Sequence, residues 1–246
     1  DGDGSSDDKY KNEQASIEVL RDIKFKLVDH VYFVRIWSTR SIKSVVNTAS
    51  VWKPDTDLSW YAKLGRQKEL IRLGHFGVVG YLAPHKEKHA SHNSMPQILQ
   101  MTDMGAMGIS GASRHKNILN KLLPHPVRFH LVWSKVQGKQ PLFAWEAIPP
   151  SNDFVALGHV FTNASAPPVL RDIRCVPKHW LTISNTVPRL VWTDVGTVGR
   201  SGSLWSVSTM NHLVAVEGHN PPQRDFYDFR CKNFFCTSDF RMVPAT

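Results

Sequence analysis

The sequence predicts an all-β domain: three Trp-marked antiparallel repeats in a pseudo-threefold, β-prism-like arrangement, with a long inserted loop in repeat one. Fifteen Pro and fifteen Gly spread along 246 residues argue against a helical bundle. Short apolar runs alternate with turns rich in Gly, Ser, Asn and Pro, which is typical of antiparallel sheets. Six of the eight Trp fall into three pairs of similar spacing: Trp37 and Trp52, Trp133 and Trp145, Trp192 and Trp205.

The residues around these Trp pairs repeat as well. In each pair the first Trp ends an apolar run and the second begins another, which predicts a hairpin. The predicted hairpins cover residues 34–54, 130–147 and 189–207. A third strand leads into Gly-His each time, so His75, His159 and His219 are expected at equivalent strand ends. Three small sheets are most simply arranged around a shared centre, with a two-sheet sandwich as the main alternative.

The chain is expected to form one domain over residues 14–246, behind a flexible acidic tail at 1–13. The repeats are expected at approximately 30–125, 126–183 and 184–246. Repeats two and three share a Pro-Pro pair followed by an Arg-Cys pair, which strengthens the assignment.

Repeat one is longer than the other two because of extra residues at 55–68 and 83–122. We expect a long loop or small subdomain there, where a module often acquires its own binding surface. A short helix is expected near 116–123. Residues 14–31 predict one more strand or helix that closes the fold.

Several motifs resemble a repeat of fungal vacuolar protein sorting-associated proteins and of an uncharacterised plant family. They are Ser50-Val51-Trp52-Lys53-Pro54, Trp145-Glu146-Ala147-Ile148-Pro149-Pro150 and Val191-Trp192-Thr193-Asp194. A related segment occurs inside chorein-type bridge-like lipid-transfer proteins. The resemblance covers about residues 30–230 and implies an accessory module of a larger protein, without catalytic residues, for membrane-contact targeting or adaptor binding. The longer, His-rich loop of repeat one departs from the family pattern, so no function located there can be carried over.

A net charge of +9 favours anionic partners such as acidic lipid headgroups or an acidic adaptor protein. The basic residues concentrate in predicted loops, and Trp60 and Trp180 fall outside the Trp pairs, so both are expected as exposed anchors. The expected membrane- or ligand-binding residues are Lys86, Lys88, Arg114, Lys116, Lys135, Lys139, Trp60 and Trp180. Nucleic acid is not an expected partner, because no reading motif or basic stripe with interleaved aromatics is present.

The best candidate for a metal site is formed by His85, His89 and His92, which would share one face of a helix. Pro84 precedes them, lysines lie between them and no Cys or carboxylate ligand is near, so we favour a solvated loop and expect no cofactor. A zinc-dependent enzyme stays a weak alternative.

The motifs for nucleophilic catalysis in the sequence are also incomplete. Two Gly-x-Ser segments, 108–112 and 199–203, lack the final Gly of a nucleophile elbow. Cys175 near His179 suggests a thiol–imidazole pair, yet Cys175 occupies a repeated position that Cys231 matches, which favours a core role. The three cysteines are expected as thiols in a reducing compartment.

The sequence therefore predicts a non-enzymatic recruitment module of a larger chain, cytoplasmic and peripheral at membranes, that contacts anionic lipid headgroups or an adaptor through the basic loops of repeats one and two. No apolar run reaches the length of a membrane-spanning helix. The alternative function is a lectin-like carbohydrate-binding module that uses the three equivalent strand ends.

Overall fold

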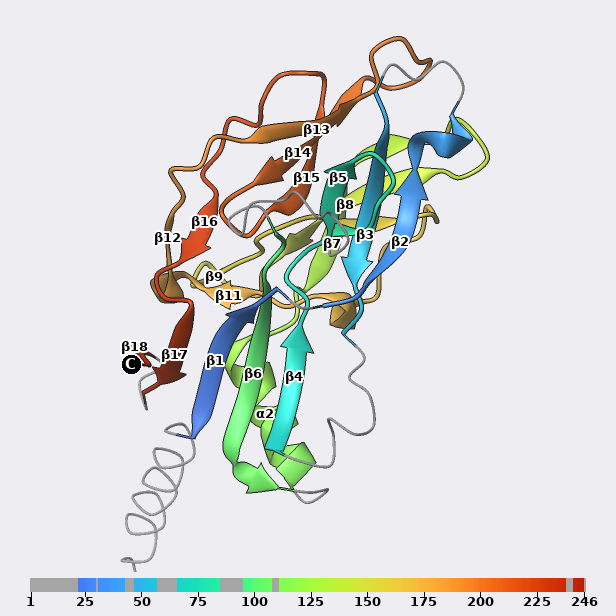
Figure 1. The fold of residues 1–246 in the computed structure, drawn as a ribbon. Coiled ribbons are helices and arrows are strands. Elements are labelled where there is room, and N and C mark those ends of the chain that lie inside the picture. The colour runs from blue at the N-terminus through green and yellow to red at the C-terminus, as the bar shows by residue number, and fades with distance from the viewer. Residues whose placement is uncertain are drawn as a thin grey trace, which may run out of the picture.

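The computed structural model describes residues 22–29, 31–42, 47–56, 66–84, 95–107, 111–237 and 241–245. Within these ranges the chain is mostly β, with antiparallel strand pairs and one α-helix (Figure 1). The predicted mostly-β, antiparallel class is confirmed. The tail at 1–13 lies outside the described residues.

Three hairpins share one construction. Their strands are β2 (Phe33–Ser38) with β3 (Ala49–Pro54), β7 (Arg128–Lys135) with β8 (Leu142–Ile148), and β13 (Arg189–Thr193) with β14 (Gly202–Val207). In each ladder the register shifts by one residue immediately before the first Trp, at Trp37, Trp133 and Trp192. Such a bulge bends the strand and re-aims the next side chain. The bulge therefore belongs to the repeated unit, as the Trp itself does.

A third strand pairs with each hairpin: β5 (Phe76–Val79), β10 (Val160–Thr162) and β15 (His212–Glu217). Copy two forms a separate sheet with the order β10-β8-β7. Copies one and three are joined where His212 pairs with Phe76, which gives a six-stranded sheet with the order β13-β14-β15-β5-β3-β2.

The starts of these third strands meet in a closed ring of backbone hydrogen bonds. The His75 N–H donates to the His159 carbonyl (3.1 Å), His159 N–H to Leu213 (3.0 Å), and Leu213 N–H back to His75 (2.8 Å). The equivalent positions are therefore His75, His159 and Leu213, and the prediction that placed His219 in this set is wrong. The backbones come so close that a Cβ on Gly74 would lie 2.9 Å from the Gly158 Cα.

The paired Trp residues lie on two faces of the sheets. Trp37, Trp133 and Trp192 pack in one shared cluster, with ring centroids 5.4 Å apart for Trp37–Trp192 and 6.2 Å for Trp133–Trp192. The second Trp of each pair lies in one of three separate clusters. In β3, for example, Val51 is opposite Trp37, so the next residue along the strand points to the other face. Only half of the six paired Trp thus lie in the shared cluster.

The insertion in repeat one is a sheet and a helix rather than a loop. β4 (Arg66–Ile71) and β6 (Ile98–Met107) join β1 (Ile23–Val28), β17 (Asn233–Cys236) and β18 (Met242–Pro244) in the order β18-β17-β1-β6-β4. Helix α2 (Gly111–Leu122) packs Leu119 and Leu122 into the core of this sheet. The described part of the segment before repeat one holds the strand β1, and this sheet with α2 forms the lower part of the molecule in Figure 1.

Short elements connect the two parts. β9 (Phe154–Val155) pairs with β11 (Val176–Pro177), and β12 (Leu181–Ile183) pairs with β16 (Tyr227–Phe229). Three single 3-10 turns lie at Thr39–Ser41, Leu170–Asp172 and Lys178–Trp180.

Candidate functional site

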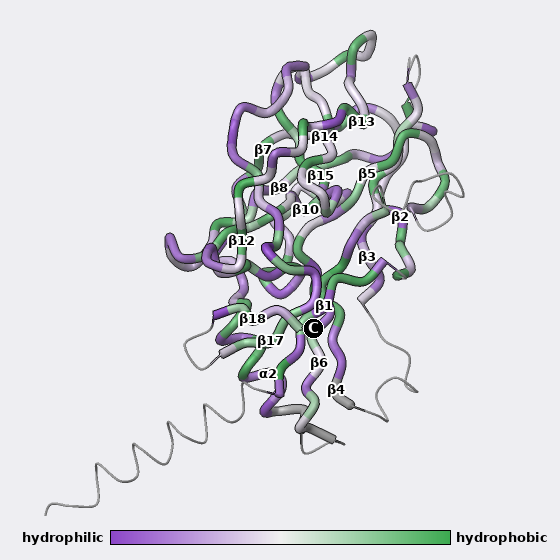
Figure 2. Tube along the Cα trace, turned by 60° about the vertical axis from the view of Figure 1, so that its left-hand side comes forward, coloured by the Kyte–Doolittle hydropathy of each residue, from purple (hydrophilic) through white to green (hydrophobic). Residues whose placement is uncertain are grey.

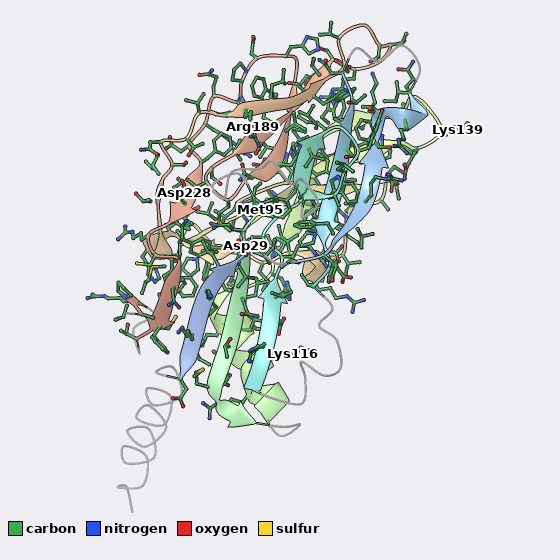
Figure 3. The ribbon with its side chains drawn as sticks, viewed as in Figure 1. Asp29, Met95, Lys116, Lys139, Arg189 and Asp228 are labelled. Atoms are coloured by element: carbon green, nitrogen blue, oxygen red, sulfur yellow. The ribbon has the colours of Figure 1, made fainter. Side chains whose placement is uncertain are left out.

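The loops of hairpins two and three expose apolar side chains at the end of the molecule farthest from the five-stranded sheet (upper right in Figure 1). The exposed fraction is 69% for Val136 in the β7–β8 loop, and 51% and 77% for Val195 and Val198 in the β13–β14 loop. Lys139 is exposed at the same end, as Figure 3 shows. We call Val136, Lys139, Val195 and Val198 the hairpin-tip surface.

A buried ammonium group holds the two loops together. The Lys135 Nζ donates to Asp194 Oδ2 (3.2 Å), Thr197 Oγ1 (2.6 Å) and the Val198 carbonyl (2.7 Å). These three acceptors satisfy all three ammonium hydrogens, which is the condition for burying a lysine. The β13–β14 loop is thus fixed to the end of β7.

Asp194 is the centre of this network. Its Oδ1 accepts from the Gly202 N–H (3.0 Å) and lies 2.8 Å from the His219 Nε2. Burial raises the pKa of Asp194, but hydrogen bonds from His219, Gly202 and Lys135 outweigh burial and bring the pKa below its usual value. Asp194 is therefore ionised at neutral pH and balances the charge of Lys135.

The first Trp of a repeat supports the loop of the next repeat. The Trp37 Nε1 donates to the Gln140 carbonyl (3.1 Å), and Gln140 Nε2 donates back to Ile36 O (2.8 Å). The Trp133 Nε1 donates to the Arg200 carbonyl (3.1 Å). The buried Trp192 Nε1 finds no partner in the part of the chain that the structure describes.

Exposed valines on loops held this way cannot fold back to bury themselves. Apolar side chains beside an exposed cation, on a surface that no element of the described residues covers, are typical of a site that contacts a partner or an interfacial lipid layer. The hydropathy colouring shows apolar residues in the loop beyond β13 (Figure 2). The hairpin-tip surface is the strongest candidate for a binding surface among the described residues.

Two of the predicted binding residues are buried, so the structure corrects them. Lys135 holds the loops together, as described above. Trp180 is fully buried in the core of the five-stranded sheet, with its ring centroid 5.1 Å from that of Phe25 and 5.2 Å from that of Phe234. Neither side chain lies at the surface.

The remaining predicted residues do not form one basic surface. The exposed Lys116 on α2 and the exposed Lys139 lie at opposite ends of the molecule (Figure 3). Arg114 is partly buried, with Nε 3.8 Å from Asp103 Oδ2 and a terminal nitrogen 3.9 Å from Asp22 Oδ2. The other predicted positions, Trp60, His85, Lys86, Lys88, His89 and His92, lie outside the described residues.

The repeated histidines stabilise the junction between repeats. The Nδ1 of His75 accepts from the Phe161 N–H (3.0 Å), and the Nδ1 of His159 accepts from the Ala215 N–H (3.1 Å). Burial and then nearby Arg224 lower the pKa of His159 to about 3, so this ring is neutral at pH 7. Both rings are buried.

The cysteines are free thiols in the described structure. Burial raises the pKa of Cys175 and of Cys236 to about 12. A thiol with so high a pKa is a poor nucleophile at neutral pH, in keeping with the core role expected for Cys175.

Among the described residues, no group of three or more His, Cys, Asp or Glu side chains could hold a metal ion. None of the described helices has the length and apolar character needed to cross a bilayer.

Sequence reasoning missed the hairpin-tip valines, although a signal was present. In Val136-Gln137-Gly138-Lys139 and in Val195-Gly196-Thr197-Val198-Gly199, valines lie beside glycines in predicted turns. Valine is out of place in a solvated turn, since turns favour Gly, Pro, Asn, Asp and Ser.

Comparisons with known proteins identify a matching protein family and a similar solved structure. A family model described as vacuolar protein sorting-associated protein 62 matches residues 14–218. No curated protein sequence matches the chain significantly. The crystal structure of GNIP1Aa from Chromobacterium piscinae is similar with a TM-score of 0.54 and 19% sequence identity, over 88% of this chain and 38% of that one. At this identity the similarity shows the fold alone, and the chain spans well under half of that structure.

Proposed function

This chain belongs to the vacuolar protein sorting-associated protein 62 family, and from that membership we propose that it is a sorting-related recruitment module that docks on anionic membranes through the hairpin-tip surface. The proposed setting is the cytoplasmic face of a membrane, with the chain as a peripheral module of a larger protein. Docking needs no catalytic step and no cofactor.

The observation that carries the proposal is the exposure of Val136, Val195 and Val198 on loops that Lys135 and the Trp indoles hold in place. Valine side chains entering the interface would gain hydrophobic free energy, up to about 1.5 kcal/mol for each one fully buried. Lys139 would add about 1 kcal/mol beside anionic headgroups. The combination supports reversible, salt-sensitive binding.

The prism-like arrangement is part of the same proposal. The ring of hydrogen bonds through His75, His159 and Leu213, together with the matching bulges, supports a pseudo-threefold relation of the three copies. That relation would bring all three hairpin loops to one end, which suits docking on a flat surface.

The lectin-like alternative is less well supported. It depends on three open, equivalent strand ends, whereas His75 and His159 are buried and Leu213 holds the third position. An apolar leucine cannot offer the hydrogen bonds that sugar hydroxyls need.

Vesicle flotation tests the proposal. The double substitution Val136→Asp with Val198→Asp should weaken binding to vesicles rich in phosphatidylserine or phosphoinositide by at least about tenfold, because two charges would enter the interface. Lys139→Glu should weaken binding at low salt and have little effect at high salt.

Matched controls are available on the same chain. Val187→Asp changes a side chain that is 81% exposed in the segment before β13, and Lys116→Glu changes an exposed lysine on α2. Both should leave flotation unchanged. Wild-type protein that fails to float on any composition, or tip variants that float as well as the controls, would overturn the proposal and favour an adaptor protein.

A further inference from the structure

A second site lies on the side of the molecule, between copies one and two. β2, the end of β3 and β10 surround a cleft of about 310 Å³. This volume is at the lower end of the range typical of small-molecule sites. Its polar lining consists of Arg35, Lys53, Arg72, His75, Thr162, Asn163 and Asp172.

The cleft carries an excess of positive charge. Of its four charged side chains, three are cations and one is a carboxylate. Arg72 is engaged with the protein itself: it donates to the Asp172 carbonyl (3.1 Å) and to Thr56 Oγ1 (2.9 Å), and it lies 3.9 Å from the Asp172 carboxylate. Arg35 lies opposite Trp52 and over its ring, 5.9 Å from the ring centroid, so its guanidinium is on the other face of the sheet from Lys53. Lys53 has no carboxylate partner in the described part of the chain, and it can turn toward an incoming anion.

His75 adds a buried donor to this cleft. Its exposed fraction is only 3%, and its Nδ1 is taken by the Phe161 N–H, so the neutral ring carries its proton on Nε2. Burial first, and then Arg72, Lys53 and His212, lower the pKa of His75 well below its usual value, which keeps the ring neutral. No acceptor for Nε2 is found among the residues that the structure describes.

The corresponding cleft between copies two and three is closed by the protein's own side chains. Lys53 follows Trp52 and Glu146 follows Trp145, so Glu146 takes the place of Lys53. Arg224 pairs with Glu146 and also lies 3.0 Å from the His159 Nε2. A guanidinium thus occupies the space beside His159, whereas the cleft beside His75 is lined by Lys53, which has no carboxylate partner in the described part of the chain, and by the His75 donor.

We propose that the cleft between copies one and two binds a phosphate group, as a phosphomonoester, with Lys53 and the His75 Nε2–H as its donors. Arginine and lysine are the usual side chains for this anion, and a buried neutral imidazole adds a directed hydrogen bond. The site is distinct from the hairpin-tip surface, and membrane docking does not require it. The phosphate could belong to a soluble metabolite or to a lipid headgroup, since both present the same group.

Isothermal titration with inorganic phosphate and with myo-inositol 1-phosphate tests the site. Lys53→Glu gives copy one the residue type that copy two has at the equivalent position, Glu146. It should weaken phosphate binding at least about tenfold. Arg35→Gln, on the other face of the sheet, and Lys116→Glu should leave phosphate binding unchanged. Thermal unfolding of each variant checks that the fold is intact, and Glu146 shows that the fold accepts a carboxylate at this position.

Two further comparisons distinguish a soluble metabolite from a lipid headgroup as the source of the phosphate. They also distinguish the phosphate site from membrane docking through the hairpin-tip surface. Equal affinity for the soluble ester and for phosphoinositide vesicles would support a metabolite site, and binding to vesicles alone, lost in Lys53→Glu, would support a headgroup site. The double variant Val136→Asp with Val198→Asp should bind the soluble ester as tightly as the wild type does, whether or not it still floats with vesicles. No phosphate binding in either form, or binding that Lys53→Glu leaves unchanged, would overturn the proposal.

Discussion

At the scale of single residues, the fold depends on buried polar groups whose partners come from distant parts of the chain. Lys135 has three acceptors, and Asp194 joins it to the Gly202 backbone and to His219. The sequence did not predict the burial of Lys135, because its partners are about 60 residues away along the chain. A lysine in a predicted turn looks like a solvated charge until such partners are known.

Removing the ammonium should therefore be costly. Lys135→Met leaves the buried Asp194 carboxylate without its main counter-charge, and we expect the free energy of unfolding to fall by about 3–5 kcal/mol. Urea denaturation measures the loss. Lys139→Met, four residues further on and exposed, is the control and should change stability by less than about 0.5 kcal/mol. Equal effects of the two substitutions would mean that the network contributes little.

The buried histidines predict a pH dependence. Burial lowers the pKa of His159 to about 3 and of His212 to about 4, and that of His75 falls well below its usual value. Below about pH 6.5 the unfolded chain binds protons that the folded chain does not, so stability is full above that pH and is lost as pH falls toward the folded pKa values. Each histidine contributes a slope of about 1.4 kcal/mol per pH unit in this window.

Urea unfolding at about pH 7.5 and about pH 5 tests this linkage. His159→Leu introduces the residue that copy three has at the equivalent position, Leu213. It should lower stability at neutral pH, because the Ala215 N–H loses its acceptor, and should make the pH dependence shallower by about one proton. An unchanged slope would show that His159 titrates normally in the folded state.

At the scale of elements, the close approach of the third strands should tolerate no extra atom. Gly74→Ala would place a Cβ 2.9 Å from the Gly158 Cα and 3.1 Å from the His212 ring. Gly158 and His212 directly precede two members of the hydrogen-bonded ring, His159 and Leu213, so we expect a loss of about 2–3 kcal/mol. Gly218→Ala is the comparison, with a φ of +80° and no atom within 4 Å, and should cost only about 1 kcal/mol. Thermal unfolding that ranks Gly218→Ala as the more damaging would contradict this explanation.

The hairpins were predictable from sequence, because a bulky aromatic at the end of each apolar run marks the same place in three ladders. The third strands were harder to align. Gly-His occurs both at Gly74-His75, where a strand starts, and at Gly218-His219, where a strand has ended, so the motif matched at the wrong end of β15. The two glycines also differ in backbone, since only Gly218 has a positive φ.

At the scale of the whole molecule, segments that are far apart in the sequence pair to form the five-stranded sheet, and the sequence did not predict this pairing. β1 near the start and β17 near the end flank each other in a sheet that β4 and β6 of the insertion complete. No local pattern indicates such a pairing, because its partners are separated by most of the chain. Lys116 and Lys139 lie at opposite ends of the molecule, so these two predicted binding residues do not share one contact surface.

Hydrogen exchange of the full chain, with and without anionic vesicles, tests the central claim of membrane docking most directly. We predict slower exchange confined to the loops 136–141 and 194–201, with the amides of α2 and of the five-stranded sheet unaffected. Protection that appears on α2 or on the five-stranded sheet instead, or vesicle binding with no protected amide in either loop, would contradict docking through the hairpin-tip surface.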